Sequence, residues 1–471
     1  MSTPFLFFFL CCLVLVSCTE DEELSLLEVP EADESPITGV TNGDRNATNL
    51  SPDIVREWTD VLLQNERHAV GLRPNGSARA LAYIYLAAYE TALPALRGFT
   101  SNTRRLDGLN LERDFRGADN ASVALALNAC FADVINHFLI NVPAELQDDV
   151  DDFELAMRDE LTRGLSDRAI AEAEDWGAYV ARQVIEYSQT DREAEEQILD
   201  PQPRSYEPPV GEGFWTYSAD PERALFPYWE RVRTFVIPAE ETTTLPPLAY
   251  STVAGSPFRE QMEEVYAVNN AARGRDDEQL WIAEFWSDDV ERLMISPPAR
   301  QISIANQLAD QYSLSLGESL ALFLRVGFAM NDAAVATWKY KYAHMVMRPS
   351  VYLQDLIDPE FRTNLFRLIF WPDPGFPGYP SGHSCFASAA GGVFRETFGN
   401  QTNFTDRTHE GRTEFRGAPR TYSTFDQLAE ENAYSRIPLG VHVRMDCDEG
   451  LRLGYEIAGA VNDLTLREED F

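Results

Sequence analysis

The sequence predicts an all-α protein. Apolar side chains recur at intervals of three and four over several long segments, which is the period of a helix with one buried face. No run of alternating apolar and polar residues is long enough to predict a sheet, and no internal repeat is present. Hydrophobic residues make up 44% of the 471 positions, which is enough for a sizeable core.

The predicted helices form two groups separated by a long connection. The first begins near residue 54, because Pro52 favours a first helical turn and apolar side chains follow at helical spacing. Its later members are predicted over 78–94, 119–140, 144–163 and 167–190, and the second group over 256–270, 276–289, 297–311 and 315–346. Residues 191–255 are rich in proline, glycine and aromatic side chains, and they predict one irregular connection of a length that usually carries function or joins domains.

The N-terminal segment predicts export from a bacterial cytoplasm. No charge occurs over residues 1–17, and residues 5–16 form an apolar run that is too short for a span of about 20 residues. The run ends in Leu15-Val16-Ser17-Cys18, which resembles a lipobox and makes residues 1–18 a lipoprotein signal peptide with Cys18 lipidated. An ordinary cleaved signal peptide is the alternative. Residues 19–50 are acidic and predict a tether, so we expect an extracytoplasmic protein that is lipid-anchored to the outer membrane or cell surface, with no later segment crossing the bilayer.

Charge and cysteine content exclude several classes of protein. The net charge of −37 argues against nucleic acid and anionic lipid as partners, because phosphates repel such a surface. After loss of the signal peptide only Cys130, Cys385 and Cys447 are available to the fold, which excludes a disulfide scaffold and a C-x-x-C metal site. Pairing of Cys385 with Cys447 stays open, with two buried thiols as the expectation.

Three short segments of the C-terminal half carry candidate chemistry, and the first contains Trp338, Lys341 and Arg348. Lys341 and Arg348 are seven residues apart and share a helix face if the helix runs through both. Pro349 predicts the end of that helix and places the guanidinium at its terminus, beside a cavity. Two solvated basic residues are the alternative.

The second segment is Gly378-Tyr379-Pro380-Ser381-Gly382-His383-Ser384, followed by an apolar helical stripe. Ser381 and Gly382 are therefore expected at a helix N-terminus, where free N–H groups and the helix dipole favour an anion. His383 adds a group that exchanges protons near neutral pH. A capped helix with a surface histidine is the alternative.

The third segment runs from Ser435 to Asp446. Pro438 and Gly440 predict a loop between Arg436 and His442. A guanidinium matches oxyanion oxygens, while a neutral imidazole serves as a metal ligand or as a nucleophile toward phosphorus. Asp446 either orients His442 or Arg436, or caps the last helix.

Taken together, Lys-x6-Arg-Pro, Pro-Ser-Gly-His and Ser-Arg-x5-His-x3-Asp resemble the signature shared by vanadium-dependent haloperoxidases and the type-2 phosphatidic-acid-phosphatase superfamily. Aromatic segments at 213–215, 226–229 and 278–286, together with Trp338, are similar to the bacterial haloperoxidase-like group, over roughly Tyr206 to Ala460. The resemblance implies two packed helical bundles, which we expect over 51–245 and 246–471. It places the active site in the C-terminal bundle, covered by the 191–255 connection.

The resemblance also implies a vanadate(V) cofactor. Its oxygens are expected on Lys341, Arg348, Ser381, the Gly382 N–H and Arg436, with His442 as the ligand of vanadium. His383 is expected to take a proton from hydrogen peroxide and Lys341 to polarise it, so that a halide is oxidised to hypohalous acid, which then reacts with a small organic acceptor.

Phe376 stands where algal bromoperoxidases usually place a second histidine, and with Tyr379 and Trp338 it is expected to form the halide side of the site; packing in the core is the equal alternative. Iodide or bromide is favoured, and the acidic surface leads us to expect activity that rises with salt. An acid phosphatase that works through a phosphohistidine at His442, with His383 as the acid, is the competing enzyme. A surface lipoprotein that only sequesters an oxyanion is the non-enzymatic alternative.

Overall fold

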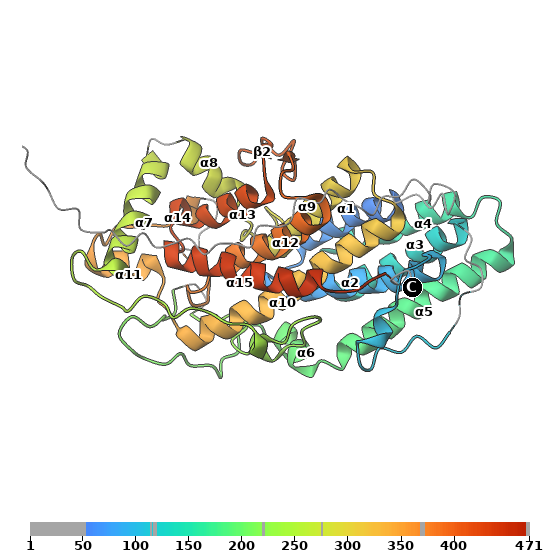
Figure 1. Ribbon diagram of the computed structural model, residues 1–471, viewed down its shortest axis with the longest axis horizontal. Helices are drawn as coiled ribbons and strands as arrows, with labels where there is room; N and C mark the ends of the chain where they lie inside the picture. The colour runs from blue at the N-terminus through green and yellow to red at the C-terminus, as the bar shows by residue number, and fades with distance from the viewer. Residues whose placement is uncertain are drawn as a thin grey trace, which may run out of the picture. The chain divides into compact units, whose positions relative to one another are not determined.

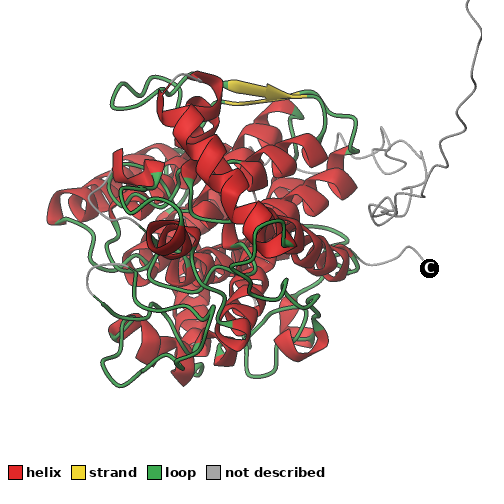
Figure 2. Cartoon of the chain, turned by 90° about the vertical axis from the view of Figure 1, so that its left-hand side faces the viewer, coloured by secondary structure: helices red, strands yellow, loops and turns green. Residues whose placement is uncertain are grey.

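Helices account for nearly all regular structure, as the apolar spacing predicts (Figure 2). The structure, a computed structural model, describes residues 53–113, 115, 120–218, 222–274, 277–367 and 373–467. The signal peptide and the tether predicted over 1–50 lie outside these residues. All described residues fall within one compact unit, so the domain boundary predicted at 245/246 stays a prediction.

The first group of helices builds the N-terminal core. It comprises α1 (Asp53–His68), α2 (Asn75–Ala92), α3 (Asn120–Phe138), α4 (Ala144–Leu161) and α5 (Asp167–Gln189). Every residue of α2 is buried, because α2 packs against α3 and α5 and also against α10 of the second group (Figure 1). An alanine-rich helix such as α2 permits this close packing on several sides.

The second group surrounds α10, a helix of 29 residues. It comprises α7 (Pro257–Gly274), α8 (Asp277–Phe285), α9 (Pro297–Gln311), α10 (Leu316–His344), α11 (Pro349–Leu356), α12 (Gly382–Phe398), α13 (Phe425–Tyr434), α14 (Arg436–Leu439) and α15 (Arg444–Asn462). Besides α2, α10 packs against α12 and α15 (Figure 1). Contrary to expectation, α10 is long and apolar enough to cross a membrane, although 94% of its most apolar window is buried inside the protein.

Glycines let α12 and α15 approach closely, and this contact positions the second and third motifs. A Cβ atom at Gly450 would lie 2.5 Å from the Ser381 carbonyl oxygen, and one at Gly454 would lie 2.3 Å from the Cys385 carbonyl oxygen. Since real Cβ atoms do not approach that closely, both positions require glycine. Cys385 and Cys447 are buried free thiols here, as is Cys130.

Several local predictions are wrong. The helix predicted over 276–289 ends at Phe285, and the connection predicted as wholly irregular contains α6 (Arg192–Leu199). The predicted loop after Arg436 begins with the short helix α14, since Pro438 falls within a single helical turn. Among the described residues one small antiparallel sheet exists, formed by β1 (Phe404–Asp406) and β2 (Arg420–Tyr422). These strands are too short to show an alternating pattern in the sequence.

Candidate active site

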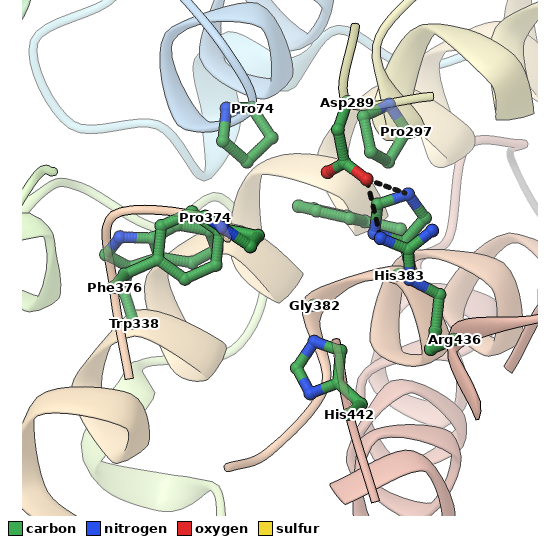
Figure 3. A pocket seen from close by; sticks show the side chains of 11 residues that line it. Pro74, Asp289, Pro297, Trp338, Pro374, Phe376, Gly382, His383, Arg436 and His442 are labelled. Atoms are coloured by element: carbon green, nitrogen blue, oxygen red, sulfur yellow. Dashed lines mark hydrogen bonds and ion pairs between the residues drawn. The ribbon is translucent and has the colours of Figure 1, made fainter. Parts of the chain in front are cut away.

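A pocket of about 290 Å³, counted with its open mouth, lies where the two helical groups meet (Figure 3). It is lined by Pro74, Asp289, Pro297, Trp338, Pro374, Phe376, Gly382, His383, Phe386, Arg436 and His442. Pro74 precedes α2, so the site is not confined to the C-terminal group as predicted. No lining residue among the described part of the chain comes from the 191–255 connection.

The structure brings the three predicted segments together. Six of the predicted residues line the pocket, namely Trp338, Phe376, Gly382, His383, Arg436 and His442. The other four, Lys341, Arg348, Ser381 and Asp446, are fully buried and form contacts with these residues or with the backbone beside them.

The N-terminus of α12 forms one wall of the pocket. Ser381 is the N-cap residue, and its hydroxyl accepts a hydrogen bond from the Ser384 N–H at 3.4 Å. The Ser381 N–H donates to the Asp446 carbonyl oxygen at 2.8 Å, which ties this turn to the start of α15. The predicted helix N-terminus is therefore present, and its dipole and free N–H groups favour an anion in the pocket.

His442 is held at both ring nitrogens. Arg348 Nη1 lies 3.1 Å from Nε2, and because a guanidinium only donates, Nε2 carries a lone pair. The ring proton is therefore on Nδ1, which donates to Asp446 Oδ2 at 3.0 Å. Burial lowers the pKa of His442 well below 6.5, with the cations Arg348 and Lys341 adding to the effect, so the ring is neutral. Asp446 also accepts from the Val443 N–H at 3.3 Å, so it both contacts His442 and caps α15.

Lys341 and Arg348 lie behind the pocket with no exposed surface. Lys341 Nζ donates to the carbonyl oxygens of Pro377 and Gly378 at 2.9 and 2.8 Å, and burial together with Arg348 lowers its pKa well below 10.5. The predicted shared helix face is wrong, because α10 ends at His344 and Arg348 is the N-cap residue of α11. Both side chains reach the site all the same, since the chain turns back after α10.

Arg348 and Arg436 each have one buried N–H group that finds no partner among the residues the structure describes. Arg348 donates through Nε to the Phe376 carbonyl oxygen at 2.9 Å and through Nη1 to the Val441 carbonyl oxygen at 2.8 Å, which leaves Nη2 free. Arg436 donates through Nη1 to the Trp286 carbonyl oxygen at 3.1 Å and through Nη2 to Asp289 at 2.5 Å, which leaves Nε free. Buried charged donors are normally paired, so these two groups call for an acceptor.

Asp289 is the pocket residue that the sequence prediction missed. Its Oδ2 contacts Arg436 and lies 3.8 Å from His383 Nε2 (Figure 3). Burial opposes its ionisation, but the charge of Arg436 and its hydrogen bond outweigh this and lower the pKa of Asp289. The acidic pair at positions 288 and 289 was the available signal, but the apolar spacing extended the predicted helix through it.

His383 projects from the first turn of α12 toward Asp289 (Figure 3). Burial and the charge of Arg436 lower its pKa to about 3, so the ring is neutral at physiological pH. Its Nε2 has no hydrogen-bond partner among the described residues. The ring is therefore available to exchange a proton with a molecule in the pocket.

Trp338 and Phe376 form an aromatic wall, with ring centroids 4.7 Å apart. Lys341 Nζ lies 5.1 Å from the Phe376 centroid, and the Arg348 guanidinium lies 4.9 Å from it. The 191–255 connection supports this wall from behind, because Trp338 Nε1 donates to the Leu225 carbonyl oxygen at 3.2 Å. The connection thus packs behind the site and does not cover it as predicted.

The donor set fits a small oxyanion. Unpartnered N–H groups of two buried arginines meet a helix N-terminus and two neutral imidazoles, one of which presents a lone pair. Among the described residues no group of three or more His, Cys, Asp or Glu side chains could hold a bare metal ion. Vanadate, an oxyanion whose central atom also takes a nitrogen ligand, fits this donor set.

The described residues form a helical-bundle fold around a buried pocket that fits a small oxyanion, and known proteins share this fold. Residues 321–468 match the family model described as the VCPO second helical-bundle domain. The chain is similar to the crystal structure of the first bacterial vanadium-dependent iodoperoxidase, with a TM-score of 0.77 and 24% identity over 90% of this chain and 99% of that one.

Two bacterial vanadium-dependent chloroperoxidase structures are also similar. The apo form has a TM-score of 0.63 and 14% identity over 83% of this chain and 94% of that one. The holo form has a TM-score of 0.61 and 15% identity over 89% and 93%. No curated protein matches the sequence. The predicted resemblance to the vanadium haloperoxidases is confirmed, and with it the helical-bundle fold.

Proposed function

We propose that this protein is a vanadium-dependent haloperoxidase, which oxidises a halide with hydrogen peroxide to hypohalous acid. The observation that carries the proposal is the pairing of two neutral histidines with two free, buried guanidinium N–H groups around one pocket. The fold shared with bacterial vanadium-dependent iodoperoxidase and chloroperoxidase supports it.

The residues present would hold vanadate from several sides. The His442 Nε2 lone pair, which accepts from Arg348 Nη1 in this structure, would bind vanadium in place of that hydrogen bond, and Arg348 Nη2, Arg436 Nε and the α12 N-terminus would bind the oxygens. Bound vanadate would supply a Lewis acid that activates peroxide while the vanadium keeps its oxidation state of five. Because these donors are fixed by backbone carbonyls, they need little reorganisation when the anion enters.

His383 and Lys341 serve the proton and charge balance. Halide, hydrogen peroxide and one proton give hypohalous acid and water, so a group must accept and return protons within the pocket. The neutral His383 ring takes a proton from peroxide at its free nitrogen. Lys341, held beside Phe376, places positive charge near the reacting oxygens.

Iodide or bromide is the halide we propose. The wall of Trp338 and Phe376 makes one side of the pocket apolar, which costs a large and weakly hydrated anion little hydration, while Lys341 and Arg348 behind the wall supply the attraction. A small organic acceptor would take the oxidised halogen. We also propose that the protein is lipid-anchored through Cys18 outside the cytoplasm. This part of the proposal is supported by the lipobox motif alone.

A phosphatase is the second candidate, because the His442 lone pair is equally suited to attack phosphorus. The purified protein should be assayed with and without orthovanadate for oxidation of iodide, bromide and chloride, and in parallel for hydrolysis of an aryl phosphate. We expect vanadate to switch on halide oxidation. Aryl-phosphate turnover that vanadate inhibits would establish the phosphatase, and tight vanadate binding with neither activity would establish a sequestering protein.

A further inference from the structure

Four arginines gather beside the pocket of this acidic protein, outside the machinery described above. They are Arg67, Arg73, Arg292 and Arg412, which surround His68 and are called the arginine rim below. Arg67 Nη2 lies 3.1 Å from His68 Nε2, while Arg73 Nη2 and the Arg292 N–H both donate to the Arg67 carbonyl oxygen, at 3.0 and 2.8 Å. Arg412 Nη2 donates to the Leu293 carbonyl oxygen at 2.6 Å.

The arginine rim belongs to the same two segments that line one end of the pocket. Arg73 directly precedes Pro74, and Arg292 lies between Asp289 and Pro297. Figure 3 shows Pro74, Asp289 and Pro297 together, on the side of the pocket away from His442. Hydrogen bonds tie the two segments together, since Glu66 Oε2 accepts from the Ser296 N–H at 3.0 Å and Glu291 Oε1 accepts from the Gly71 N–H at 2.9 Å.

Nearby carboxylates compensate only part of the positive charge of the arginine rim, since the charge of Glu414 acts on both Arg67 and Arg412. Arg73 pairs with Glu66 at 3.5 Å and Arg412 with Glu414 at 3.0 Å. Among the described residues neither Arg67 nor Arg292 has an ion-pair partner, and Arg292 is exposed. Arg73 is only 6% exposed, and its Nε and Nη1 groups are buried without a partner, so they call for an anion or water as acceptor.

We propose that the arginine rim is an anion-collecting site that draws small inorganic anions from solution to the end of the pocket lined by Pro74, Asp289 and Pro297. The chain carries a net charge of −37, and such a surface repels anions elsewhere. Charges act over about 8 Å at physiological salt, so a local group of guanidiniums governs the last part of the approach. The proposal that the arginine rim collects halide rests on the proposed function. The proposal that it collects oxyanions does not.

The rate of orthovanadate binding to the vanadate-free protein tests this proposal directly. Pocket Trp338 offers a fluorescence signal for stopped-flow measurement at low and high salt. We expect the double variant Arg67→Gln/Arg292→Gln to bind about tenfold more slowly at low salt, with an unchanged dissociation rate and with the difference lost at high salt. Arg163→Gln, an exposed arginine between α4 and α5, is the matched control and should bind like the wild type.

A second arm uses iodide. If the proposed function holds, the double variant should lose about tenfold in kcat/KM for iodide with kcat unchanged. The proposed role of the arginine rim would be overturned if the double variant bound vanadate as fast as the wild type, or if its slower binding persisted at high salt. This conclusion would hold even if halide is oxidised normally. If the double variant binds vanadate more slowly but the wild-type protein oxidises no halide, the anion-collecting role of the arginine rim is supported and the haloperoxidase function is rejected.

Discussion

The two pocket histidines are both buried and neutral, yet they are held very differently. His442 is fixed between a carboxylate at Nδ1 and a guanidinium at Nε2, whereas His383 Nε2 has no hydrogen-bond partner and faces Asp289 across 3.8 Å. A ring fixed on both sides keeps its Nε2 atom in one direction, as a metal ligand requires. A ring that is free on one side can pick up and release a proton. The contrast is consistent with the proposed roles of His442 as ligand and His383 as proton carrier.

Loss of the fixed histidine should have the largest effect. His442→Ala removes the proposed vanadium ligand, and we expect halide oxidation to fall by about a thousandfold or more. Vanadate binding, measured separately by equilibrium dialysis, should weaken in parallel. His137→Ala on α3, outside the pocket, is the control. A variant that keeps wild-type vanadate affinity would remove His442 from the ligand role.

Weakening the support of the fixed histidine should have an intermediate effect. Asp446→Asn can still accept a hydrogen bond from Nδ1, but it removes a carboxyl group whose pKa burial raises to about 7 and which is therefore partly ionised at neutral pH, so we expect vanadate affinity to fall about 10- to 100-fold. Asp448→Asn, an exposed position two residues further along α15, is the matched control. Equal affinities in the two variants would mean that Asp446 serves only as a helix cap.

The order of residues in the three motifs was sufficient to predict which side chains meet, but not how they are held. Ser381 and Gly382 were predictable at a helix start, because an apolar stripe follows them. Asp289 was not, since no glycine or proline marks the end of α8 and the helical pattern continues through it. Pro74 was not either, because its place in the pocket depends on the packing of α2 against α10, far along the chain.

His383, the less restrained histidine, should make the stability of the vanadate-free protein depend on pH. The pKa of His383 is lowered by burial from 6.5 to about 3, so on acidification the unfolded chain takes up a proton that the native state does not. Stability is therefore lost as the pH falls below about 6.5, by about 1.4 kcal/mol per pH unit for one such group. Relative to His383→Gln, the wild-type free energy of unfolding should fall by about 2 kcal/mol between about pH 6.5 and pH 5. A constant difference in urea unfolding over this range would show that His383 is not buried in its neutral form.

Substitution of Asp289, the carboxylate beside His383, should have the smallest effect. Asp289→Asn removes the one negative charge close to His383, and because that charge raises the His383 pKa, the pKa should fall further below about 3 in the vanadate-free protein. NMR titration of the ring would measure this shift. We expect kcat to fall about three- to tenfold, because Arg436 loses a charged partner but keeps its bond to the Trp286 carbonyl oxygen. Asp107→Asn, in an exposed loop, is the control. A rise of the His383 pKa in Asp289→Asn would show that the charge of Asp289 does not stabilise the protonated ring.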